Sequence, residues 1–98
     1  MNTQLTVIAS IRAKAGHSRA LGDRLLQMVE TTRNEPGCLE YAIHVSKQHP
    51  ELWCFYENWR SEADLQVHFE TAGFKAMVAD VAAWQEGEWD IQYFQMMS

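Results

Sequence analysis

Cationic side chains are scarce in this sequence. Its 98 residues include 8 Lys and Arg against 13 Asp and Glu, so the formal net charge at pH 7 is −5. A chain of this sign is not attracted to the phosphates of nucleic acid or to an anionic membrane surface. No stripe of basic residues offsets the balance. We therefore expect neither nucleic acid nor a membrane as a partner.

Long hydrophobic runs and cysteine motifs are also missing. No segment approaches the ~20 apolar residues that a membrane-spanning helix needs. The opening stretch MNTQLTVIAS lacks the basic segment and apolar run of a secretory signal. The two cysteines, Cys38 and Cys54, form no metal-binding or redox motif. These absences predict a protein of the reducing cytoplasm.

Large apolar side chains, by contrast, are plentiful. The hydrophobic fraction is 47%, with four Trp and four Phe. The length fits a single domain over residues 1–98, and such a chain buries only about 60–65% of its unfolded surface. The excess of apolar surface indicates a ligand pocket, a subunit interface, or both.

Hydrophobic spacing predicts the order of the elements. Residues 5–12 alternate as a strand does, Pro36-Gly37 stops the first helix, and Ser61 with Asp64 forms a capping box for the second. We predict strands over 5–12, 38–46, 52–59 and 88–97, and helices over 17–34 and from 61 up to Gly87, the latter interrupted at Gly73. The order β-α-β-β-α(α)-β predicts an α+β, ferredoxin-like sandwich with a four-stranded antiparallel sheet and helices on one face. Because the other face would be bare, we expect a homodimer.

The register of the central hairpin decides which residues share a face. If Lys47 lies opposite Glu51, one face is aromatic and aliphatic except for Glu57. The pairs on that face are Val45–Trp53, Ile43–Phe55, Tyr41–Glu57 and Leu39–Trp59. The opposite face carries Glu40, Ala42, His44 and Ser46 against Asn58, Tyr56, Cys54 and Leu52. The first face therefore suits the core beneath the helices.

Two titratable residues fall on faces that should be dry. Glu57 projects from the sheet toward the helices, and His68 lies on the inward face of its helix, next to Phe69. A structural interpretation pairs Glu57 with Arg60, Tyr41 or a helix N-terminus, and His68 with a backbone carbonyl. A functional interpretation makes them an acid/base pair at the floor of an apolar pocket, where burial would raise the pKa of Glu57.

Other candidate sites are weaker. His44 faces away from Glu57 and His68, and no metal-binding spacing is present, so we expect no metal. Cys54 lies opposite His44 rather than Cys38, which argues against a disulfide.

The stretches NEPGCLEYAIHVS and PELWCFYENWRSEADLQVHFETAGF resemble the antibiotic biosynthesis monooxygenase family. The most specific parts are Pro36-Gly37-Cys38, Glu57-x-Trp59, Glu62-Ala63 and His68. The resemblance implies a dimeric α+β barrel that oxygenates a quinol or an aromatic polyketide-like molecule with O₂. It also implies that no cofactor is used, neither metal nor flavin nor haem.

The resemblance and the polarity pattern point to the same site residues. His68 is expected to accept or donate a proton, and Glu57 to orient it or to act as the base. Further substrate-binding residues are expected to be Trp59, Phe55, Tyr41 and Phe69 in the wall and Asn58 at the rim. Many relatives carry a second His where this chain has Ala72-Gly73-Phe74, so a two-histidine mechanism does not carry over. An isomerase or degrading enzyme for a small metabolite, and a binding domain without activity, stay open as alternatives.

Overall fold

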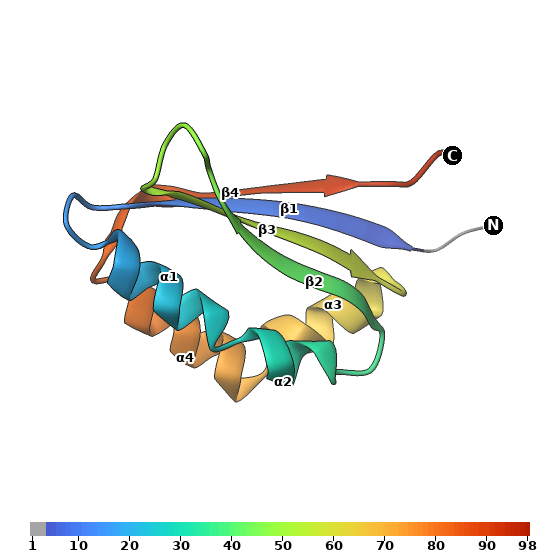
Figure 1. The fold of residues 1–98 in the computed structure, drawn as a ribbon. Coiled ribbons are helices and arrows are strands. Elements are labelled where there is room, and N and C mark those ends of the chain that lie inside the picture. The colour runs from blue at the N-terminus through green and yellow to red at the C-terminus, as the bar shows by residue number, and fades with distance from the viewer. Residues whose placement is uncertain (1–3) are drawn as a thin grey trace.

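In the computed structural model, which describes residues 4–98, helices cover one face of an open sheet (Figure 1). Residues 1–3, at the start of the stretch examined for a secretory signal, lie outside the described part. The elements are β1 (Leu5–Ala13), α1 (Ser18–Leu26), α2 (Val29–Arg33), β2 (Cys38–Val45), β3 (Leu52–Trp59), α3 (Glu62–Phe69), α4 (Ala72–Val81) and β4 (Gln85–Phe94). Among the described residues, no helix is long and apolar enough to cross a membrane.

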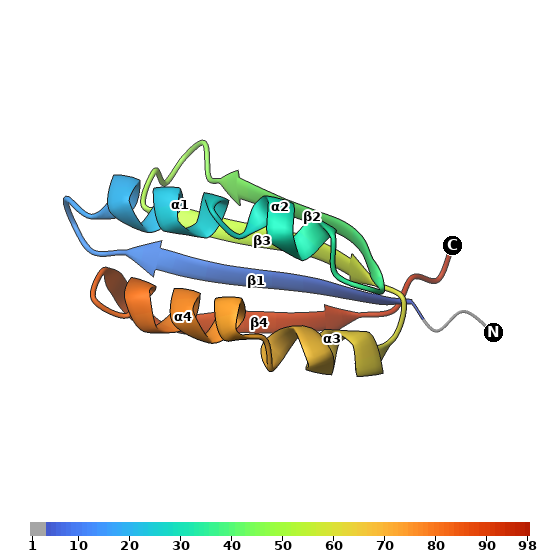
Figure 2. The same cartoon turned by 90° about the horizontal axis from the view of Figure 1, so that it is seen from below.

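The sheet has the strand order β2-β3-β1-β4, and all neighbouring strands are antiparallel. This confirms the predicted ferredoxin-like α+β fold. Helices α1 and α2 run along the β2–β3 half of the sheet, and α3 and α4 run along the β4 half (Figure 2). The helix-covered face therefore holds the core, and none of residues 4–98 forms a layer over the other face.

Alternation along β1 explains how the sheet faces its helices. Val7, Ala9 and Ile11 are all less than 6% exposed and point toward the helices, as their spacing predicts. Leu21 and Leu25 of α1 are fully buried against them. Burial of these side chains on a period of two in the strand and about 3.6 in the helix fixes the sandwich.

Two of the predicted helix boundaries are wrong. The single helix expected over 17–34 is two helices, separated by a turn at Gln27 and Met28, although Met28 is buried as its spacing indicates. The second interruption lies at Glu70 and Thr71, not at Gly73. Thr71 causes it, because its hydroxyl donates to the carbonyl of His68 at 2.8 Å and accepts from the backbone N–H of Phe74 at 3.2 Å, which caps α4.

Ser61 caps α3 as predicted, accepting from the backbone N–H of Asp64 at 3.2 Å. The last strand, in contrast, begins at Gln85 rather than Glu88 and ends at Phe94. Gly87 lies within it at φ +76°, where the register with β1 shifts, so this glycine marks an irregularity and not the start of the strand.

The register of the β2–β3 hairpin determines which side chains face the helices. Tyr41 lies opposite Glu57, and the pairs Val45–Trp53, Ile43–Phe55 and His44–Cys54 are also as predicted. The pair Leu39–Trp59 is wrong, because a register shift sets Cys38 opposite Trp59 and leaves Leu39 57% exposed. The shift lies beyond Glu57, so this side chain still points into the helix-covered face.

Candidate functional site

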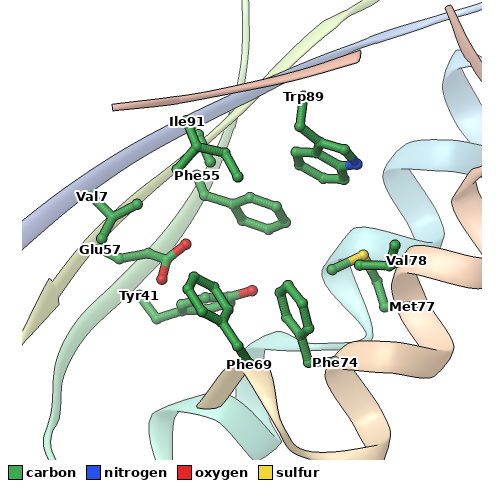
Figure 3. Close-up of a pocket in the computed structure, with 11 residues that line it drawn as sticks. Val7, Tyr41, Phe55, Glu57, Phe69, Phe74, Met77, Val78, Trp89 and Ile91 are labelled. Carbon is green, nitrogen blue, oxygen red and sulfur yellow. The ribbon is translucent and has the colours of Figure 1, made fainter. Parts of the chain in front are cut away.

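A cavity of about 260 Å³ lies between the sheet and helices α3 and α4 (Figure 3). Its lining residues are Val7, Ala9, Tyr41, Phe55, Glu57, Phe69, Phe74, Met77, Val78, Trp89 and Ile91. Glu57 is the only carboxyl among them and Tyr41 the only hydroxyl, while no Lys, Arg or His from the described residues is included. The cavity is therefore apolar, with one carboxylic acid in its wall.

Stacked rings give the cavity its shape. Phe55 and Trp89 are nearly parallel, with ring centroids 5.6 Å apart, and Tyr41 lies 5.5 Å from Phe55. Phe69 and Phe74 close the helical side, with centroids 5.0 Å apart. Flat walls of this kind favour a planar aromatic ligand.

Glu57 is held in this wall by its neighbour on the same face of β3. It is 6% exposed, and its Oε1 accepts from the indole Nε1 of Trp59 at 2.8 Å. Within residues 4–98, its other oxygen accepts no hydrogen bond. The partner is thus Trp59, two residues further along the strand, rather than Arg60, which binds Asp64. The indole of Trp59 therefore positions one of the two carboxyl oxygens.

Burial governs the protonation of Glu57. It raises the pKa of the carboxyl to about 7, opposed by the Trp59 hydrogen bond and reinforced by the negative charge of Glu35. Such a group is present in both protonation states near neutral pH, which suits proton transfer. Burial, and then the charge of Glu57, also raise the pKa of Tyr41, so its hydroxyl keeps its proton.

The raised pKa of Glu57 makes a testable prediction for stability. The folded protein holds this proton up to about pH 7, whereas the unfolded chain releases it near pH 4.5. The contribution of Glu57 to the free energy of unfolding therefore falls as pH rises between these values, by on the order of 3 kcal/mol.

Urea unfolding at a series of pH values measures this effect against Glu57→Gln, which keeps an acceptor for Trp59 but does not titrate. Stability of the variant relative to the wild type should rise from pH 5 to pH 8. A difference that does not change with pH would contradict the shift.

His68 lies behind the cavity wall and not in it. It is 1% exposed, and its Nδ1 is 3.0 Å from both carboxyl oxygens of Glu35. Its ring packs against Trp59 and Phe74, with centroid separations of 4.8 and 5.1 Å. The expected backbone carbonyl partner is thus wrong. Only Glu57 of the predicted acid/base pair reaches the cavity directly.

Some of the other predicted site residues line the cavity, and others do not. Tyr41, Phe55 and Phe69 line the cavity as expected. Trp59 is fully buried between Glu57 and His68 and does not line it. Asn58 lies on the opposite face of the sheet, where it donates to Glu40 at 2.9 Å, so its expected place at the rim is wrong.

Several residues of the site were missed from the sequence. Phe74, Met77 and Val78 recur at i, i+3 and i+4, a spacing on one helix face that could have assigned them to the cavity. Trp89 and Ile91 both fall within the predicted last strand, two positions apart and therefore on one face, a pattern that could have assigned them to the cavity. Glu35 carried no signal, because it lies in the turn that follows α2.

No three His, Cys, Asp or Glu side chains gather as a metal site within residues 4–98. Cys38 and Cys54 are both free thiols. Burial, followed by the charges of Glu57 and Glu35, raises the pKa of Cys38 to about 11, so this thiol is a poor nucleophile.

This ferredoxin-like α+β sandwich has an apolar cavity with one acid, the kind of lining that is typical of small-molecule sites. A sequence model of the antibiotic biosynthesis monooxygenase family matches residues 4–80. The chain belongs to this family.

Individual relatives agree with the family assignment. The "Probable quinol monooxygenase YgiN" of Escherichia coli K12 is 34% identical over 82 residues, which cover 74% of this chain and 79% of that protein. An uncharacterized protein of Synechocystis is 36% identical over 50 residues, but the match spans only 34% of its length.

Solved structures agree in fold. A crystal structure from Pseudomonas aeruginosa is 33% identical, with a TM-score of 0.93 and coverage of 100% of this chain and 98% of the other. A structure from Mycobacterium tuberculosis is 22% identical, with a TM-score of 0.91 and coverage of 97% and 96%. The second likeness concerns the fold alone.

Proposed function

We propose that this protein is a monooxygenase that oxidises a small aromatic hydroquinone with O₂. The observation that carries the proposal is Glu57, a carboxyl with a pKa near neutrality in an otherwise apolar, ring-lined cavity. The family and the printed name of the Escherichia coli relative support the reaction class.

The proposed chemistry assigns proton transfer to the protein and electron transfer to the substrate. Glu57 takes a hydroxyl proton on its free oxygen, while Trp59 holds the other oxygen. The substrate anion is the better reductant, and it supplies all the electrons that O₂ requires as the hydroquinone becomes a hydroxyquinone. One oxygen atom enters the product and the other leaves as water. The apolar walls exclude solvent during these steps.

The lining residues also bear on whether the reaction needs a cofactor. They offer one carboxyl and no imidazole or thiol, too few ligands for a catalytic zinc or iron ion. The cavity is also slightly smaller than the roughly 300–1,000 Å³ of typical ligand pockets. We therefore propose a substrate of about one to two rings, oxidised without metal, flavin or haem.

The open face of the sheet supports a further part of the proposal, a homodimer. The register places Ile8 and Tyr56 side by side on this face, with the 46%-exposed Phe94 next to Thr6. A second copy packed face to face would remove this apolar surface from water.

Oxygen uptake by the metal-stripped protein, with a panel of hydroquinones and anthrols, tests the function. Turnover should occur without added metal, and His68→Gln should lower it because the buried ring that supports Trp59 is changed. His44→Gln, an exposed histidine on the opposite face of the sheet, serves as the matched control and should retain activity.

Two results would count against the proposal. No uptake across the panel would remove the oxygenase. Turnover that persists under nitrogen would instead favour an isomerase, since Glu57 could carry a proton between two substrate atoms without O₂.

A further inference from the structure

Glu35 holds the buried imidazole of His68 from the side away from the cavity. Both carboxyl oxygens lie 3.0 Å from Nδ1. The two residues come from different halves of the fold, since Glu35 precedes β2 and His68 belongs to α3. No other side-chain hydrogen bond to the ring of His68 is seen within residues 4–98.

The main chain fixes where Glu35 stands. Its backbone N–H donates to the carbonyl of Thr32 at 3.0 Å, and its own carbonyl accepts from Cys38 at 3.1 Å. The side chain is 15% exposed and borders a second cavity of about 280 Å³ among the helices. That cavity shares no lining residue with the apolar one. Solvent therefore reaches Glu35 by a route separate from the proposed substrate site.

The chemistry of the Glu35 carboxylate and the His68 imidazole decides which of them donates the hydrogen bond. An ionised carboxylate only accepts hydrogen bonds, whereas a neutral imidazole donates through one nitrogen and accepts through the other. A proton on Nδ1 satisfies both partners and leaves the lone pair on Nε2. Nε2 then lies on the far side of the ring from Glu35.

The same ring borders the aromatic wall of the cavity. The ring of His68 contacts Phe74, Phe69 and Tyr41 at centroid distances of 5.1, 5.9 and 6.0 Å, and all three line the apolar cavity. One layer of side chains thus separates a potential proton acceptor from the cavity.

We propose that Glu35 is a positioning residue, which holds His68 with the proton on Nδ1 and the lone pair on Nε2 directed toward the cavity wall. Its consequence for catalysis rests on the proposed function, in which Glu57 takes the substrate proton and the His68 ring packs against Trp59, the residue that holds Glu57. The opposite tautomer would present an N–H to the wall and could accept no proton there.

The ¹⁵N shifts of the imidazole nitrogens at pH 8, measured without substrate, test the placement directly. His68 should show a protonated Nδ1 and a bare Nε2 in the wild type. In Glu35→Gln, the amide offers both a donor and an acceptor, so a mixture of tautomers is expected. Glu30→Gln, an exposed residue of the preceding helix, should leave the shifts unchanged.

Kinetics provide the second readout. Glu35→Gln should lower kcat by about 10–100-fold with little change in KM, as the loss of an orienting partner does elsewhere, and Glu35→Asp should recover part of the loss. A wild-type His68 with its proton on Nε2, or on both nitrogens, would overturn the proposal, as would a Glu35→Gln variant that keeps the wild-type tautomer. Absence of oxygen uptake by the wild type would refute only the proposed function, because the shifts are measured without turnover.

Discussion

Glu57→Gln is expected to reduce the turnover of a hydroquinone by about 10²–10⁴-fold, the usual contribution of a general base. The amide has the size of the carboxyl and can still accept from Trp59 Nε1, so the cavity keeps its shape. What it loses is the ability to take a proton. Wild-type kcat should rise with pH through about 7, following the pKa of Glu57, while the residual activity of the variant should not.

Steady-state oxygen uptake measures kcat, and quenching of tryptophan fluorescence measures binding, since Trp89 lines the cavity. Glu40→Gln is the matched control. Glu40 is an exposed carboxylate on the opposite face of the same hairpin, and its change to an amide should leave turnover near the wild-type level. Full activity in Glu57→Gln would show that the proton goes elsewhere.

Gly37→Ala is expected to lower the free energy of unfolding by about 2–4 kcal/mol. Gly37 ends the turn before β2 at φ +85°, a conformation that costs an L-residue about 1–2 kcal/mol. A Cβ here would also overlap the side chain of Asp64. That carboxylate binds Arg60 through two hydrogen bonds of 2.9 Å and accepts from the cap residue Ser61, so it has little freedom to move.

Gly16→Ala separates the two causes. Gly16 has nearly the same backbone conformation, at φ +80°, but a Cβ there meets nothing within 4 Å. This variant should lose only the conformational part, about 1–2 kcal/mol. Urea unfolding of both proteins gives the comparison. Equal losses would mean that Asp64 moves aside at no cost.

The sheet and the position of Glu57 could be predicted because they depend on alternation. In a strand, a one-residue slip turns every side chain to the other face, so the segregation of aromatic and aliphatic residues onto one face favours one register. That register places Glu57 on the same face. The same logic failed at Leu39, where a register shift removes the alternation. At Asn58 the alternation gives the correct face, opposite to that of Glu57, and the expected place at the rim is wrong because that face is turned away from the cavity.

The contacts around His68 could not be predicted, for a different reason. Its partner Glu35 stands in a turn 33 positions earlier, and no periodicity relates a turn to a helix face. Trp59 is among the residues expected in the wall of the site. Its indole N–H instead holds Glu57, a choice that depends on side-chain rotamers rather than on sequence pattern.

The break between α3 and α4 at Thr71, here called the joint, affects both the width of the cavity and the burial of His68. Phe69 ends α3 and Phe74 lies in the first turn of α4, so the two rings stand on opposite sides of this joint, and each packs against the imidazole. Opening the angle between the helices to admit a bulkier molecule would uncover His68 in the same movement. Size selectivity and access to the imidazole are therefore coupled, and a variant that widens the cavity at Thr71 should also expose His68.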